Sequence, residues 1–357
     1  MNVLHLKKIS KLLLIVSFIA LAFSSCTSSS SYTIGKWNNR SDLDGSTRSG
    51  AASFKIGNDE YICCGYNGTK RLCDLWKYDA EHDSWVSMES LPDEAARSGA
   101  IGFSANGKGY ITTGYNGTIY MNDTWEFDPN VGDKGTWTKK ADYPGVARTN
   151  ALAFTLTKDN TEYGYVGTGY DGLNCLKDFY RYDSTSDKWE KMGETSNTAG
   201  NGFSGKKRQG GSSFVINNIA YVCCGEANGY IDDFYKFDPS TGLWTQLRDI
   251  ANNSDDSYDD NYSGIVRSKA VTFVVDGKAF LTTGSNGTLK TDYWIYNPTT
   301  DLWTGCSDDS YTPFKGSARQ SAIGFSVGSK GYVVTGSSSS VYFDDLWELS
   351  PYENTEE

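Results

Sequence analysis

The feature that most constrains this chain is a spaced pattern of residues that occurs six times along it. In each copy an Arg is followed six positions later by a Phe, with small residues between them, as in RSGAASF and RQGGSSF. An apolar segment ending in Gly follows, and in five of the six copies that Gly lies 17 residues after the Arg. An Asp stands eight or nine residues beyond the Gly. Repeats of this kind dictate the whole architecture of a chain.

Each copy is predicted to form four short β-strands. Its segments alternate apolar and polar residues and are separated by turn signals such as Asn67-Gly68, which is typical of strands and not of helices. Four strands repeated every 50 to 60 residues or so is the spacing of a β-propeller blade. We therefore predict an all-β fold, a six-bladed propeller with four antiparallel strands in each blade. In the third copy the Gly lies 21 residues after its Arg, which predicts a longer hairpin near Lys158.

A Trp marks the fourth strand, and its positions predict how the ring closes. Only five such residues follow the six Arg, namely Trp85, Trp137, Trp189, Trp244 and Trp303. The sixth is Trp37, which precedes the first Arg. We predict that the N-terminal strand around Trp37 joins the last blade, the one begun by Arg319. This closure removes an open sheet edge that would otherwise invite aggregation.

The composition agrees with this fold and excludes several others. Aromatic residues make up 14% of the chain, and Gly is far commoner than Pro, at 38 against 7. A disordered chain lacks so many rings, and a helical bundle lacks so much Gly. The formal charge of −11 argues against a nucleic-acid partner, because phosphates require a basic surface.

The repeats resemble those of the kelch family. The resemblance is carried by the hydrophobic strand ending in Gly, as in YITTG, then the aromatic pair of DTWEFD, then the Trp, and it covers residues 34–350. It implies a kelch-type propeller similar in architecture to galactose oxidase and to a sialic-acid mutarotase. Kelch repeats usually have two Gly after the hydrophobic strand, whereas here a Thr or Cys takes one of the two places.

The N-terminus is predicted to be an export signal. Residues 1–25 combine Lys7, Lys8 and Lys11 with an apolar run too short to span a bilayer, followed by small residues and Cys26. The segment FSSC resembles a bacterial lipoprotein box, which implies lipidation of Cys26 and attachment to a membrane, the outer membrane being favoured. Residues 26–33 are then a Ser-rich tether, residues 34–350 the propeller and residues 351–357 an acidic tail.

Cysteine, histidine and acidic residues do not predict a metal, a cofactor or a disulfide. Neighbouring strand residues point to opposite faces, so Cys63 and Cys64 are a poor disulfide pair, and we predict free buried thiols where other repeats place Thr. Without the signal peptide the only His is His82, which excludes a copper site of the galactose oxidase kind and a Ser-His-Asp triad. The acidic run from Asp255 to Asp260 matches no calcium-loop spacing, and a solvated loop is predicted there.

The predicted binding face follows from strand direction. The start of the first strand and the end of the second share one face, so the six repeated Arg should ring one mouth of the central channel. The residues just after each Gly share this face, and three are aromatic. The predicted binding residues are Arg48, Arg97, Arg148, Arg208, Arg267, Arg319, Tyr66, Tyr115 and Tyr170. An Asp also repeats in every copy, so a second interpretation is that each Arg forms a scaffold ion pair with it. These residues are Asp74, Asp123, Asp178, Asp233, Asp292 and Asp345.

Two functions follow from these residues. Arg suits carboxylates and Tyr suits ring-shaped ligands, so the first is a non-catalytic, envelope-anchored recognition module. It binds a neutral or anionic glycan, or a protein. The second, implied by the mutarotase resemblance, is a sugar mutarotase or epimerase that uses Arg and Glu. Its candidate base is Glu226, the one acid among the residues that follow the repeated Gly. If the Arg are scaffold, the long loops before Arg208 and Arg267 become the candidate site.

Overall fold

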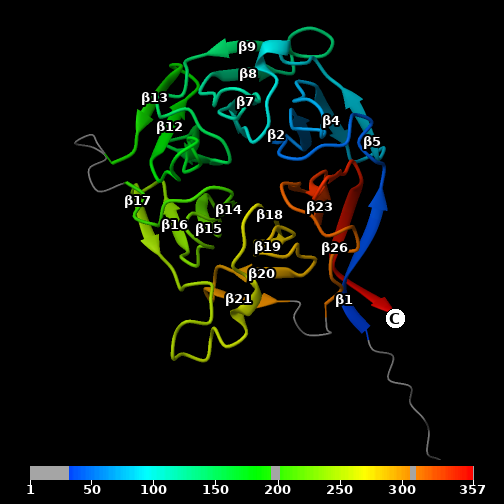
Figure 1. The fold of residues 1–357 in the computed structure, drawn as a ribbon, viewed down its shortest axis with the longest axis vertical. Helices are drawn as coiled ribbons and strands as arrows, with labels where there is room; N and C mark the ends of the chain where they lie inside the picture. The colour runs from blue at the N-terminus through cyan, green and yellow to red at the C-terminus, as the bar shows by residue number, and fades with distance from the viewer. Residues whose placement is uncertain (1–31, 194–201, 306–310, 357) are drawn as a thin grey trace, which may run out of the picture. The chain divides into compact units, whose positions relative to one another are not determined.

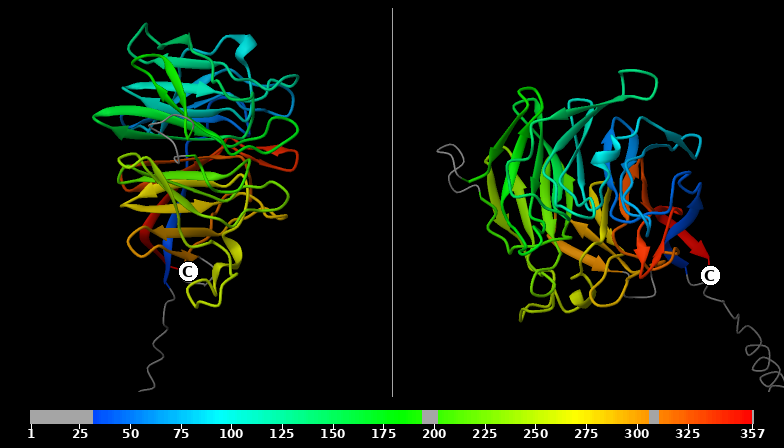
Figure 2. Two further views of the ribbon diagram at one scale, coloured as in Figure 1. Left: turned by 90° about the vertical axis from the view of Figure 1, so that its left-hand side faces the viewer. Right: turned by 45° about the horizontal axis from the view of Figure 1, so that its top comes forward.

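The computed structural model describes residues 32–193, 202–305 and 311–356 and contains the six predicted blades around a central channel (Figure 1). Each blade is a four-stranded antiparallel sheet whose first strand lies innermost. Figure 2 shows the sheets from the side, stacked around the ring. The predicted signal peptide, Cys26 and most of the tether lie outside the described residues. Among the described residues, no helix has the length and apolarity needed to cross a bilayer.

The strands follow the order of the repeats. Blade 1 contains β2 (Ala52–Ile56), β3 (Asp59–Cys63), β4 (Leu75–Asp79) and β5 (Ser84–Ser87). Blade 2 contains β6 (Ile101–Ala105), β7 (Lys108–Thr112), β8 (Thr124–Asp128) and β9 (Thr136–Lys140). Blade 3 contains β10 (Leu152–Lys158), β11 (Thr161–Gly167), β12 (Phe179–Asp183) and β13 (Lys188–Lys191). The seven-residue β10 and β11 form the longer hairpin predicted near Lys158.

The second half repeats this plan. Blade 4 contains β14 (Ser212–Ile216), β15 (Ile219–Cys223), β16 (Tyr235–Asp238) and β17 (Leu243–Gln246). Blade 5 contains β18 (Val271–Val275), β19 (Lys278–Thr282), β20 (Tyr293–Asn297) and β21 (Leu302–Gly305). Blade 6 contains β22 (Ile323–Val327), β23 (Lys330–Val334), β26 (Leu346–Glu356) and, outermost, β1 (Tyr32–Arg40). Two short 3-10 turns, η1 (Asp93–Ala95) and η2 (Tyr262–Gly264), and a small hairpin, β24 (Ser337–Ser338) with β25 (Val341–Tyr342), lie in the connections.

Stacked aromatic rings hold neighbouring blades together. In each blade the Phe of the inner strand stacks on an aromatic ring of the second strand, as Phe54 does on Tyr61 with 5.2 Å between ring centroids. The next blade places a small residue against this Phe, and a Cβ atom at Gly109 would lie 2.1 Å from the Phe54 ring. Burial of one such Phe contributes about 1.5–3 kcal/mol, so the six buried Phe supply much of the stability.

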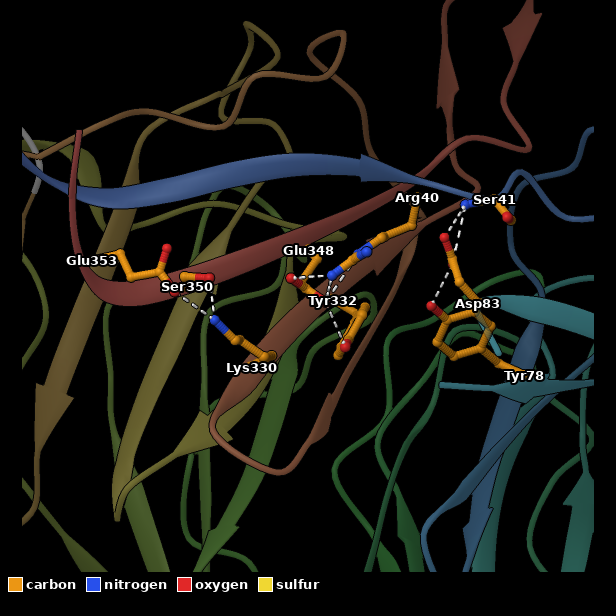
Figure 3. A network of polar contacts seen from close by, with 9 residues as sticks. All are labelled: Arg40, Ser41, Tyr78, Asp83, Lys330, Tyr332, Glu348, Ser350 and Glu353. Carbon is orange, nitrogen blue, oxygen red and sulfur yellow. Dashed lines mark hydrogen bonds and ion pairs between the residues drawn. The ribbon is translucent and has the colours of Figure 1, made fainter. Parts of the chain in front are cut away.

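The ring closes as the position of Trp37 predicts. β1 lies beside β26, so Trp37 is in the outermost strand of the blade that contains Trp347. Polar contacts join the two ends of the chain (Figure 3). The Arg40 guanidinium donates to both oxygens of the buried Glu348 carboxylate, which also accepts a hydrogen bond from the Tyr332 hydroxyl. The predicted all-β, six-bladed fold with N-terminal closure is confirmed.

A closed ring of backbone hydrogen bonds between neighbouring blades narrows one end of the channel. The residue two positions after each repeated Arg donates its backbone N–H to the carbonyl of the same residue in the preceding blade, as Gly99 does to Gly50 at 2.8 Å. All six have left-handed φ angles between +53° and +62°. The closed ring consists of Gly50, Gly99, Asn150, Gly210, Lys269 and Ser321. The loops next to this ring carry the candidate site.

Candidate functional site

The six repeated Arg do not ring the channel mouth. Each precedes the inner strand, and its side chain is fully buried within its own blade. In blade 2, Nη1 and Nη2 of Arg97 donate to the two carboxylate oxygens of Asp123, both at 2.7 Å. The same Arg donates from Nη1 to the Thr113 carbonyl and from Nε to the Ala95 carbonyl. The equivalent ion pairs are Arg48–Asp74, Arg148–Asp178, Arg208–Asp233, Arg267–Asp292 and Arg319–Asp345.

The electrostatics of these pairs are those of a scaffold. Burial alone would raise the pKa of Asp123, but its hydrogen bonds with Arg97 and the charge of that Arg outweigh burial, and the pKa lies below its usual value. The Asp74 carboxylate is held in the same way by Arg48, and it also accepts a hydrogen bond from the Trp76 indole at 2.8 Å. With no exposed surface and a saturated hydrogen-bond fork, these six Arg have nothing to offer a ligand. The geometry matches the second interpretation of the sequence, that of scaffold ion pairs.

The three predicted tyrosines do lie on the predicted face. Tyr66, Tyr115 and Tyr170 pair through their backbones with the residue that follows the repeated Arg, next to the ring that narrows the channel. Each ring is partly exposed, and each hydroxyl donates to the carbonyl of the Gly two residues later at 2.7 Å. The Asn-Gly or Asp-Gly turns that provide these acceptors fix the rings in place. The tyrosines are therefore rigid, partly exposed surfaces.

A second row of side chains alternates with these tyrosines. It was not predicted from the sequence. The residue five positions after each Tyr turns back from the same loop, which places Arg71 and Tyr120 beside Tyr115. Tyr120 packs against Tyr115 at 4.9 Å and against Tyr170 of the next blade at 6.2 Å. The signal was in the loops YNGTKRLCD and YNGTIYMND, whose alignment puts Arg71 opposite Tyr120.

Together the two rows form a continuous arc across four blades. Tyr342 of blade 6 packs edge-on against Tyr66 of blade 1 at 5.7 Å between centroids. Arg71 follows, then the tyrosines of blades 2 and 3. We call this set the Tyr arc, and its members are Tyr342, Tyr66, Arg71, Tyr115, Tyr120 and Tyr170.

Arg71 differs from the six scaffold Arg in having no Asp partner, although three of those six, Arg148, Arg208 and Arg319, also lie over aromatic rings. Its guanidinium carbon lies 4.6 Å from the Tyr66 ring centroid and 5.1 Å from that of Tyr115, so it is stacked between two blades. In the part of the chain that the structure describes, no carboxylate pairs with it. Its Nε is buried and has no hydrogen-bond partner. It is the single cation within the Tyr arc.

A groove continues from the end of the Tyr arc. It has a volume of about 720 Å³ and lies between the loops of blades 3 and 4. Its lining includes Tyr170 and Tyr230, and Tyr230 is 41% exposed. The cations Lys206 and Lys207 also line it. Arc and groove therefore offer aromatic and basic surface over blades 6, 1, 2, 3 and 4.

Exposed apolar side chains gather at the loop tips of the same face. Four of them stand in the loops between second and third strands, and Leu173 is 87% exposed there. Val146 lies in a loop between blades 2 and 3, before Arg148. The full set is Ile119, Val146, Leu173, Tyr230 and Val341. These side chains lie on the same face as the Tyr arc.

Glu226 occupies the inner position of blade 4, where other blades have Tyr or Ser. Its carboxylate lies 3.7 Å from the ammonium of Lys269, a member of the ring that narrows the channel. It is partly exposed. The structure thus places the predicted candidate base on the arc face, paired with a cation.

The opposite mouth of the channel is lined differently. Its cavity of about 680 Å³ is bounded by all six inner strands, whose side-chain donors reach carbonyls of the preceding blade, as Thr272 does to Ser213 at 2.7 Å. This cavity is also lined by Glu60, a buried acid on the second strand of blade 1. The equivalent position is Gly or Ala in the other five blades. Burial raises the pKa of Glu60 to about 7, although a hydrogen bond from Ser53 and the charge of Lys55 oppose this effect.

The structure also describes most of the predicted cysteines and the acidic loop. Cys63, Cys64, Cys223 and Cys224 are buried and unpaired, as predicted, and Cys73 and Cys175 are half-buried free thiols. Cys306 and part of the loop before Arg208 lie outside the described residues. Among the residues that can be described, no group of His, Cys, Asp and Glu has the geometry of a metal site. In the acidic loop Asp255, Asp256 and Asp260 are exposed, but the prediction is wrong for Asp259, which is buried and accepts the backbone N–H of Ser254 at 3.0 Å.

Comparison with known proteins agrees with this architecture. The Kelch motif matches residues 47–92, which span the first blade. Among solved structures, the chain is similar to that of YjhT, with a TM-score of 0.65 and 12% sequence identity over 85% of this chain and 95% of that chain. No curated protein matches the chain. An identity this low shows a shared fold alone.

The six blades define the fold class as a six-bladed β-propeller, and its first blade carries the Kelch motif. The resemblance stated from the repeats is thereby confirmed. The blades of this protein differ from one another mainly in the loops of the face that carries the Tyr arc.

Proposed function

We propose that this protein is a non-catalytic recognition module that binds a glycan on the Tyr arc and the groove beside it. The observation that carries the proposal is the row of five tyrosine rings and one unpaired Arg on a single face. A Tyr ring offers a flat apolar surface with a polar tip, which suits the alternating apolar and hydroxyl-bearing surfaces of a sugar. Binding sites of this kind combine aromatic walls with a few polar groups.

The rigidity of the tyrosines supports this function. Each inner hydroxyl is tied to a carbonyl of its own turn, so little rotamer freedom is lost when a ligand stacks on the ring. The length of the arc favours a chain of several sugar units over a single one. A protein partner that docks on the apolar loop tips is the competing outcome.

Titration of wild-type protein with neutral and acidic oligosaccharides tests the proposal. Tyr115→Ala and Tyr120→Ala should each weaken binding roughly two- to tenfold, since one aromatic contact contributes about 0.5–1.5 kcal/mol. Tyr352→Ala is the control, because Tyr352 is exposed but lies outside the arc. Equal affinity in all three variants would move the binding site elsewhere.

The mutarotase alternative rests on Glu226. Proton NMR of sialic acid in the same sample separates the two functions, because anomer exchange reports catalysis and saturation transfer reports binding. We expect binding without acceleration of exchange. Accelerated exchange that is lost in Glu226→Gln would establish the alternative.

We propose, further, that the propeller is held at the bacterial envelope by a lipid on Cys26, with the outer membrane as its site. The sequence of the N-terminus supports this location. Cys26→Ala should release the protein from membranes into the soluble fraction on fractionation. Continued membrane association of the variant would refute the lipid anchor.

A further inference from the structure

Arg71 is a cation that the scaffold does not use. Nη1 and Nη2 make no hydrogen bond within the described residues and are not among the buried atoms, so this edge of the guanidinium reaches the surface. Its guanidinium carbon lies over the rings of Tyr66 and Tyr115, which come from neighbouring blades. A ligand can therefore reach the free Nη edge of the group, where its N–H donors point.

The fold does not require a cation at this place. The equivalent loop position is Tyr120 in blade 2, Cys175 in blade 3 and Tyr342 in blade 6. Tyr120 and Tyr342 each pack on the inner Tyr of the next blade, as Arg71 does. A ring thus fills the same space, and the turn glycines Gly117 and Gly172 make equivalent approaches to Arg71 and to Tyr120.

The surroundings make an unpaired Arg unusual here. The chain carries 44 acidic residues against 33 basic ones, yet none of the described acids pairs with Arg71. Leaving a buried donor such as its Nε without a partner costs free energy in the unbound protein. A cation without an acidic partner in an acidic molecule also creates a local positive focus for small anions.

We propose that Arg71 binds a carboxylate on a sugar ring of the glycan, so that the Tyr arc selects acidic over neutral glycans. The two Nη donors lie side by side and match the two oxygens of a carboxylate. The neighbouring rings of Tyr115 and Tyr120 would hold the sugar that carries it. This inference rests on the proposed glycan-binding function and names the substrate class.

A matched pair of ligands and a matched variant test it. The ligands are a hexuronic acid oligosaccharide and the same oligosaccharide with its carboxyl groups reduced to alcohols. The variant is Arg71→Tyr, which places in blade 1 the residue that blades 2 and 6 already have. Lys70→Ala is the control, because it removes an exposed neighbouring charge outside the stack. Thermal unfolding establishes that each variant is folded.

Wild-type protein should bind the acidic ligand about tenfold or more tightly than the reduced one, since a charge-assisted pair contributes about 1.5–3 kcal/mol. Arg71→Tyr should abolish this preference and leave the affinity for the reduced ligand unchanged, while Lys70→Ala keeps the preference. If Arg71→Tyr retains the preference, the role of Arg71 is overturned although glycan binding stands. If neither ligand binds wild-type protein, the proposed function and this inference both fail.

Discussion

The six repeated arginines of this propeller differ sharply from Arg71, which lies on the same face. The six repeated Arg are fully buried, and each is paired with the Asp of its own blade. Arg71 occurs once, lies between two tyrosines of neighbouring blades and has no acidic partner among the described residues. The comparison teaches that a residue present in every blade maintains the fold, while a departure from the repeat is where recognition can be built.

The largest effect should come from breaking a repeated pair. Asp123→Asn leaves the Arg97 guanidinium buried without a counter-charge, and we expect a loss of about 3–5 kcal/mol in the free energy of unfolding. Chemical denaturation at neutral pH measures it. Arg71→Tyr should lower the free energy of unfolding far less than Asp123→Asn does, since it disturbs no buried ion pair. Similar losses in the two variants would remove the distinction between the two kinds of Arg.

Glu60 is a second residue that occurs in one blade only, and the pH dependence of stability tests its role. Its folded pKa of about 7 lies above the ordinary 4.5, so folding favours the protonated form and stability is lost as pH rises from 4.5 to 7. We expect Glu60→Gln to be about 3 kcal/mol more stable than wild type at pH 8. At pH 4 the two proteins should unfold at the same temperature. A constant difference across this range would mean that Glu60 does not titrate between the two states.

The smallest effect concerns the place where kelch repeats have a second Gly. Thr113 has a φ of +63°, a conformation that a branched side chain adopts with strain, and its hydroxyl is buried without a partner. Thr113→Gly should raise stability by about 0.5–1 kcal/mol. Thr113→Cys should be neutral, because Cys64 has nearly the same φ of +65° at this position in blade 1. Destabilisation by Gly would show that packing of the Thr methyl outweighs the backbone strain.

The sequence predicted the fold well because the fold repeats. The count of Trp residues predicted the closing strand, and the shared spacing of Arg97 and Asp123 offered their pairing as one interpretation. The direction of the Arg side chain was not predictable, because the Arg precedes the inner strand and the period-two rule does not apply there. Arg71 escaped notice because its neighbours come from two blades, and only the closed ring brings Tyr115 beside it.

A crystal structure of the protein soaked with a hexuronic acid oligosaccharide tests the central claim most directly. We predict a sugar ring stacked on Tyr115 or Tyr120, with its carboxylate within hydrogen-bond distance of the Arg71 Nη atoms. The six buried Arg–Asp pairs should remain intact in that complex. A ligand bound at the opposite mouth beside Glu60, or one that displaces an Asp from its repeated Arg, would contradict the account.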